Sequence, residues 1–239
     1  MKSSKVNIII IVICFVLTVG ICIFLIVNHK GKVVTDALKF KEEYEAYNDY
    51  VNPNTDEKFL SVIIDENNPI IYKTAKEIVE ILKNEDALIL FGYPSSSENR
   101  MVIEALLEAT SEAKVGKLYY LDILNIRDEY ADSGNILPTQ TKKGTDAYLE
   151  IVDFLDEYLE MYYIRGEDNN LYGTTVKRVN APTFVATSKG EVIGFHEGVL
   201  SNSSKELSEE EKEELKNIYL EIINNWLNKT TICSSNSAC

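Results

Sequence analysis

Three consecutive serines, Ser95 to Ser97, precede a predicted helix and could act as hydrolytic nucleophiles. A serine attacks only when a base removes its proton, and the chain contains just two histidines, His29 and His196. No Gly-x-Ser-x-Gly frame surrounds the serines. We therefore expect Ser96 or Ser97 to cap a helix by accepting a backbone N–H, and His196 to be a surface or hydrogen-bonded residue.

The four cysteines fall into two pairs by position. Cys14 and Cys22 lie inside an apolar run, where we expect them to act as small hydrophobic residues. Cys233 and Cys239 enclose a short Ser/Asn-rich tail, where an oxidising compartment would allow a disulfide between them. Such a bond would be either incidental or redox-active.

Acidic residues dominate the charge but form no persuasive catalytic site. On one predicted helix we expect them on a solvated face; these are Asp153, Asp156, Glu157 and Glu160. A second group follows a predicted strand and would form a polar rim near Tyr93; it consists of Asp122, Arg127, Asp128 and Glu129. The spacing matches no calcium loop, phosphate loop or dinucleotide fingerprint, so we expect no metal and no cofactor.

The net charge of −14 argues against nucleic acid as a partner, because phosphate binding requires a basic surface. Residues 28–239 contain all the acidic residues and carry a net charge of −16. We expect this charge to keep the domain soluble and away from anionic lipid.

Ile8–Val27 is a run of 20 apolar or small residues without a charge, long enough to span a bilayer. We interpret it as an uncleaved signal anchor, with residues 1–7 in the cytoplasm and the remainder outside. A cleaved secretory signal is the alternative, and it gives the same compartment. The expected order is then anchor 8–27, tether 28–58, domain 59–228 and flexible tail 229–239. A short helix is expected near 35–48, within the tether.

The predicted domain alternates strands and helices, which is typical of an α/β fold. Ala87–Phe91 is a short apolar run expected to form a buried strand, and Lys117–Ile123 is expected to form a second. Thr183–Thr187 and Glu191–Phe195 are predicted to form a hairpin. Further segments are predicted as helices after Thr74, after Ser97, over 145–161 and after Ser208, with one more strand near Leu60–Ile64.

Three segments resemble the thioredoxin-like superfamily. Residues 87–100 are similar to its strand, active-site turn and helix start, 179–187 to the segment holding its cis-proline, and 189–198 to its terminal hairpin. Membrane-anchored bacterial proteins related to bacteriocin-transport accessory proteins are the most similar-looking branch. The resemblance covers roughly 68–228 and implies a central mixed sheet flanked by helices.

The sequence departs from this family at the residues that carry out its chemistry. Ser96 stands where the family has its nucleophilic cysteine, Asn99 replaces the resolving cysteine, and Leu90 replaces a buried acid. Neither Ser96 nor Asn99 can exchange disulfides. We therefore expect a redox-inactive loop, which comprises Tyr93, Pro94, Ser95, Ser96, Ser97, Glu98, Asn99 and Arg100.

The resemblance also implies a peptide-binding segment at Ala181, Pro182 and Thr183. A cis bond before Pro182 would leave the backbone of Ala181 free to pair with an extended client. Three functions remain open at this point: a membrane-anchored binding or export-assisting protein, an oxidoreductase using Cys233 and Cys239, and a structural module of the cell envelope.

Overall fold

The computed structural model describes residues 34–53, 56–132, 137–166, 168–200 and 206–235. The chain divides into two units, Met1–Thr35 and Asp36–Cys239, and every described helix and strand belongs to the second. The predicted anchor at 8–27, the tail residue Cys239 and the side chain of Cys233 lie outside the described residues. Among the helices of the described ranges, none combines the length and the apolar character that a membrane crossing requires.

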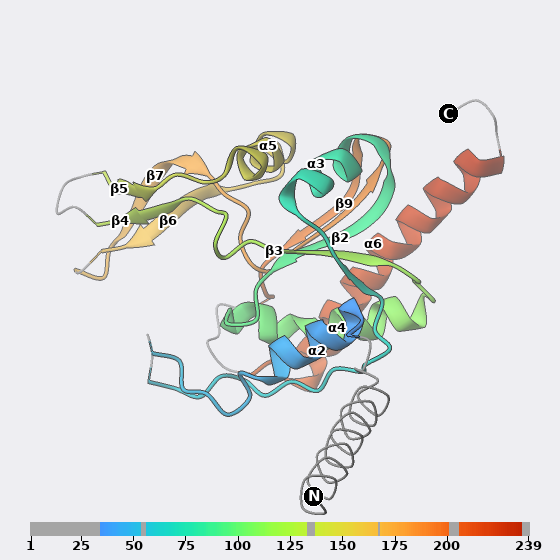
Figure 1. Ribbon diagram of the computed structural model, residues 1–239, viewed down its shortest axis with the longest axis horizontal. Helices are drawn as coiled ribbons and strands as arrows, with labels where there is room; N and C mark the ends of the chain where they lie inside the picture. Colours follow the sequence, from blue (N-terminus) through green and yellow to red (C-terminus); the bar gives the residue numbers. More distant parts are fainter. Residues whose placement is uncertain (1–33, 54–55, 133–136, 167, 201–205, 236–239) are drawn as a thin grey trace, which may run out of the picture. The chain divides into compact units, whose positions relative to one another are not determined.

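A mixed five-stranded sheet forms the centre of the second unit (Figure 1). Its strands, in spatial order, are β1 (Ile70–Tyr72), β3 (Leu118–Asp122), β2 (Asp86–Gly92), β8 (Thr183–Ser188) and β9 (Glu191–Glu197). The first three are parallel, whereas β8 runs antiparallel to β2 and to β9. The α/β class and the central mixed sheet flanked by helices are therefore confirmed.

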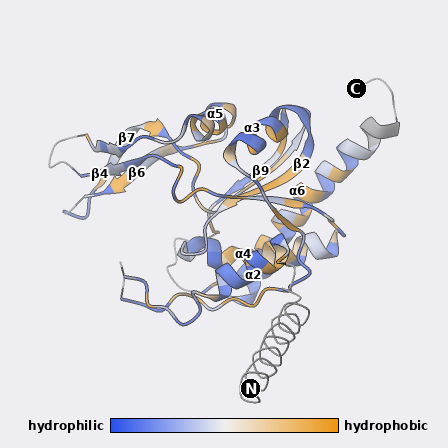
Figure 2. Cartoon of the chain, viewed as in Figure 1, coloured by the Kyte–Doolittle hydropathy of each residue, from blue (hydrophilic) through white to orange (hydrophobic). Residues whose placement is uncertain are grey.

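Helices cover both faces of this sheet. On one face lie α3 (Ala75–Asn84) and α5 (Asp146–Phe154), and on the other lie α2 (Asp36–Glu45), α4 (Ser97–Glu112) and α6 (Glu209–Ser235). The central strand β2 is buried on both sides, because Leu88 and Leu90 face one layer while Ile89 and Phe91 face the other. Figure 2 accordingly shows hydrophobic colouring along β2.

Local sequence signals place several helix starts. Thr74 and Glu77 form a reciprocal capping box at α3, and Ser208 with Glu211 does the same before α6. Ser96 caps α4, and Thr145 caps α5. These helices therefore begin close to where the sequence predicts them.

Several expectations need correction. The segment predicted as a tether contains α2, whose Phe40 and Tyr44 are fully buried in the core, so residues 36–45 belong to the domain. Leu60–Ile64 forms no strand, and the edge strand on this side of the sheet is β1, which begins at Ile70. The tail does not start at 229, because α6 continues to Ser235.

Two hairpins between β3 and β8 were not predicted. The predicted helix over 145–161 ends at Phe154, and strand β6 begins at Met161. Tyr130 and Tyr162 bring the hairpins into contact, with ring centroids 6.1 Å apart. The four strands are β4 (Glu129–Ala131), β5 (Thr139–Lys142), β6 (Met161–Arg165) and β7 (Leu171–Lys177).

Candidate functional site

Ser96 connects the start of α4 to the segment before β8. Its hydroxyl oxygen accepts the N–H of Asn99 at 3.1 Å, which is the predicted capping bond. The same hydroxyl donates to the carbonyl oxygen of Ala181 at 3.2 Å and lies 3.4 Å from Glu98 Oε2. Only 3% of Ser96 is exposed. Its hydrogen-bonding capacity is therefore used inside the protein.

No histidine is hydrogen-bonded to this serine among the residues that the structure describes, and the nearby carboxylate of Glu98 belongs to the same helix turn. His196 lies on β9, paired with Phe184, and its ring contacts the ring edge of Tyr219 on α6 at 5.4 Å. Burial lowers the pKa of His196, and its Nε2 atom is buried without a partner. His196 is thus half-buried and hydrogen-bonded to the backbone of Gly198, as one of the two predicted alternatives states, and Ser96 acts as the predicted helix cap.

Asn99 is fully buried between α2 and the end of β2. Its amide nitrogen donates to the hydroxyl of Tyr44, which lies 3.4 Å from the hydroxyl of Tyr120. Gly92 leaves the room for this side chain, since a Cβ atom there would lie 2.5 Å from Asn99 Oδ1. Burial raises the pKa of Tyr44 and of Tyr120, so both remain neutral hydroxyls at physiological pH. Asn99 is therefore a neutral, hydrogen-bonded group packed among neutral tyrosine hydroxyls.

Arg100 holds the chain that follows α2 against α4. Its guanidinium is 1% exposed and donates to Leu60 O at 2.6 Å, Tyr44 O at 2.7 Å and Pro94 O at 3.2 Å. A fourth bond, 2.5 Å long, reaches Asn48 Oδ1. Burial lowers the pKa of Arg100, although a guanidinium stays charged in proteins. All four acceptors are neutral, so Arg100 works here as a multiple hydrogen-bond donor.

The segment Ala181–Thr183 lies beside the loop, and the bond between Ala181 and Pro182 is cis, as expected. The carbonyl of Ala181 accepts a hydrogen bond from Ser96 Oγ. The backbone of Ala181 is therefore only partly free, whereas the prediction was that it is free. The N–H of Ala181 has no hydrogen-bond partner among the described residues. Thr183 Oγ1 donates to Asn180 O at 2.8 Å and orders the turn into β8.

A second hydrogen-bonded group borders this segment. Glu197 accepts from Asn180 Nδ2 at 2.7 Å and lies 3.4 Å from Thr183 Oγ1. Burial raises the pKa of Glu197 above its usual value, against the effect of these bonds. The turn before β8 is therefore held from the loop on one side and from β9 on the other.

The predicted polar rim forms only in part. Arg127 donates to the hydroxyl of Tyr93 at 3.2 Å, and its guanidinium lies 4.8 Å from the centre of that ring. Asp128 is buried, and Glu129 pairs with Lys142 inside the β4–β5 hairpin at 2.8 Å. Arg127 thus bonds to the loop, and Asp122 lies beside it, paired in register with Gly92. The acids predicted on the helix 145–161 are solvated as expected, although only Asp153 lies on α5; Asp153, Asp156, Glu157 and Glu160 are all exposed.

No group of side chains able to hold a metal ion occurs among the described residues. Comparison with family models, curated proteins and solved structures finds no match to this chain. The site combines a capped helix start, a cis-proline turn and a partly unpaired backbone, and neither Ser96 nor Asn99 carries a thiol. Such an arrangement offers a backbone donor to a peptide but no thiol for disulfide exchange.

The sequence analysis did not identify the side chains of α2 and of the turn after it that bond to the loop. Tyr44 and Asn48 lie in the segment that was interpreted as a tether. Tyr44 accepts a hydrogen bond from Asn99, and Asn48 accepts one from Arg100. A signal was available, because Phe40 and Tyr44 are four residues apart and therefore share one face of a helix.

Proposed function

We propose that this protein is a membrane-anchored, extracytoplasmic thioredoxin-like protein that binds a client polypeptide without redox chemistry. The strand order β1-β3-β2-β8-β9, with helices on both faces, supports the fold assignment. The contact between the Ser96 cap and Ala181 supports the placement of the loop. The anchor rests on the apolar run Ile8–Val27.

The unpaired N–H of Ala181 carries the binding proposal. An extended backbone gains both affinity and direction by pairing with such a group. Ser96 fixes the carbonyl of the same residue, so the N–H is presented by a backbone whose orientation is set. Replacement of both cysteines leaves this geometry in place while removing the thiol chemistry.

Site-specific photo-crosslinking in cells tests the proposal. A photoreactive residue at Ser95, which is part-exposed beside the loop, should capture a discrete client. The same residue at Glu80, exposed on α3 over the other face of the sheet, is the matched control. Equal capture at both positions, or capture at neither, would contradict a binding site at the loop.

An insulin-reduction assay on the purified full-length chain distinguishes binding from catalysis. We expect a rate no higher than that of buffer with dithiothreitol, because the loop lacks a thiol. A rate that disappears when Cys233 and Cys239 are both replaced by serine would instead favour the tail as a redox centre.

A further inference from the structure

Residues Leu60–Asp65 form an extended segment whose backbone groups are hydrogen-bonded mainly on one side. Burial alternates along it, because Val62 and Ile64 are buried while Ile63 is 83% exposed. The N–H and C=O groups of an extended chain point alternately to its two sides. The two edges of this segment can therefore be followed separately.

The edge toward α2 is hydrogen-bonded by side chains at both Val62 and Ile64. Asn48 accepts from Val62 N at 3.0 Å and donates to Val62 O at 2.9 Å. Ile64 N donates to Glu45 Oε1 at 3.0 Å, and Lys41 Nζ donates to Ile64 O at 2.7 Å. This edge is closed to a further strand.

The edge toward α4 is only partly paired, since the carbonyl of Asp65 accepts from Asn68 Nδ2 at 2.7 Å. Ile63 N donates to Glu104 Oε1 at 2.8 Å, which shows that this edge faces α4. The carbonyls of Ser61 and Ile63, and the N–H of Ser61, make no hydrogen bond with any described residue. A row of unpaired backbone groups on one edge is a template for an added strand.

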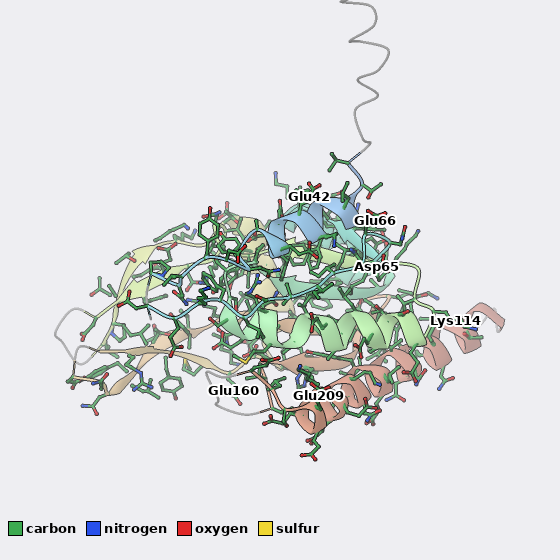
Figure 3. The ribbon with its side chains drawn as sticks, turned by 90° about the horizontal axis from the view of Figure 1, so that it is seen from below. Glu42, Asp65, Glu66, Lys114, Glu160 and Glu209 are labelled. Carbon is green, nitrogen blue, oxygen red and sulfur yellow. The ribbon has the colours of Figure 1, made fainter. Side chains whose placement is uncertain are left out.

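A groove of about 720 Å³ lies between this edge and α4. Its size is within the range of peptide and ligand sites, and Ile63, Leu107 and Val115 supply apolar surface. Figure 3 shows the segment carrying Asp65 running beside α4, with Lys114 near the C-terminal end of that helix. The groove therefore lies beside the C-terminal half of the segment, where Ile63 and Asp65 form part of its wall.

The side chains that line the groove are mainly acidic, which favours a basic ligand. Asp65, Glu104 and Glu108 line it, and Lys114 is the single base in its lining. An acidic rim around an apolar floor matches a chain that alternates basic and apolar side chains, because alternate residues of a strand point to opposite faces.

We propose that this groove binds an extended basic segment of a partner polypeptide by adding it as a strand to Leu60–Asp65. The proposal does not depend on the function assigned to the loop. Glu108 is eleven residues beyond Ser97 on α4, which places it roughly 17 Å along the helix. Changes at Glu108 therefore report on the groove alone.

Fluorescence anisotropy with the full-length chain tests the proposal, using a labelled decapeptide of alternating lysine and valine. Glu108→Lys should weaken binding about ten-fold or more, whereas the control Glu80→Lys, an exposed helical glutamate on α3, should change it less than about two-fold. Both residues are exposed, so neither change should disturb folding. Equal weakening by the two variants, or no binding of the parent peptide, would overturn the proposal.

A pair of N-methylated peptides tests strand addition itself. Methylation of every second amide blocks one edge of the peptide and leaves the other edge intact. One of the two methylated isomers should lose binding about ten-fold or more, and the other should keep it. If both isomers bind as well as the parent, the backbone is not paired and strand addition is wrong.

Discussion

At the scale of single residues, the polar side chains at the start of α4 are committed to internal hydrogen bonds. Ser96 and Asn99 are both buried, and each bonds to a different part of the chain. Serine is a strong N-cap because its short side chain reaches the N–H three residues ahead. Ser96 and Asn99 are therefore suited to stabilising the start of α4.

Replacing Ser96 by alanine should lower the free energy of unfolding by about 1 to 2 kcal/mol. The variant loses the cap on Asn99 N and leaves the Ala181 carbonyl without its donor. Urea denaturation of the full-length chain measures this change. Ser95→Ala is the control and should stay within about 0.5 kcal/mol, since no hydrogen bond of that side chain is seen. Equal effects would contradict the capping role.

Asp122 provides a prediction about pH. Burial raises the pKa of its carboxyl group, and Glu43 adds to this, whereas Leu124 N, Arg127 and Lys39 oppose it. A raised pKa in the folded state means that the native protein loses stability as the pH rises through that pKa. Asp122→Asn, which keeps an acceptor for Leu124 N, should therefore stabilise the protein at pH 7.

The gain from Asp122→Asn should shrink below pH about 3.9, where the carboxyl group is protonated in both the folded and unfolded states. Urea midpoints of the variant and the unchanged protein at pH 7 and near that lower value give the comparison. A gain of the same size at both values would show that ionisation of Asp122 is not its cause.

At the scale of elements, side chains from two helices take over the role of a neighbouring strand. Residues 60–64 are bonded to side chains on α2, in the turn after it and on α4 rather than to a strand. Arg100 is central because it bonds to Leu60, Tyr44 and Asn48 together. The N-terminal segment is thereby fixed to the helix that begins at the loop.

Arg100→Ala should destabilise the protein by about 3 kcal/mol or more, because each buried acceptor left unpaired costs about 1 to 3 kcal/mol. Chemical denaturation provides the free energy of unfolding. Arg165→Ala is the matched control on the exposed β6–β7 hairpin, where the expected change is within about 0.5 kcal/mol. A small effect at Arg100 would mean that residues 60–64 are held by α2 alone.

Introducing two cysteines tests whether residues 96 and 99 occupy the positions of a thioredoxin-like Cys-x-x-Cys loop. In Ser96→Cys/Asn99→Cys the two thiols are three residues apart at a helix start, within reach of a disulfide. Mass analysis should detect the bond after oxidation, and the variant should gain insulin-reductase activity. Ser97→Cys/Asn99→Cys, with the thiols on different sides of the helix, should gain none. A folded variant without the disulfide would contradict the assignment of this loop.

At the scale of the whole molecule, charge and hydropathy are divided between the two parts of the sequence. The apolar run at 8–27 carries no charge, whereas residues 28–239 carry a net charge of −16. Such a division suits a protein attached to a membrane whose domain is kept in solution by its own charge.

Protease added to intact cells should remove the domain while the protein still fractionates with membranes, because the run at 8–27 is predicted to remain in the bilayer. Immunoblotting of membrane and soluble fractions provides the measurement. A soluble species starting near residue 30 would favour cleavage. Protection from the protease would contradict an external domain and, with it, a disulfide between Cys233 and Cys239.

The sequence by itself determined the features that depend on neighbouring residues. The apolar run at β2, the hairpin β8–β9 and the caps at Thr74 and Ser208 follow from short-range patterns of hydrophobicity and hydrogen bonding. The class of the fold could be predicted for the same reason, since its core elements are the most regular ones.

Only the tertiary structure decided which segments belong to the core. Leu60–Ile64 has the alternation of a strand, yet its backbone partners are side chains distant in sequence, which no local pattern encodes. The hairpins of 129–177 are partly exposed and weakly patterned, so their strands could not be distinguished from loops. Asn99 and Arg100 acquired their roles from α2, because burial of a polar group requires partners that only the folded chain brings together.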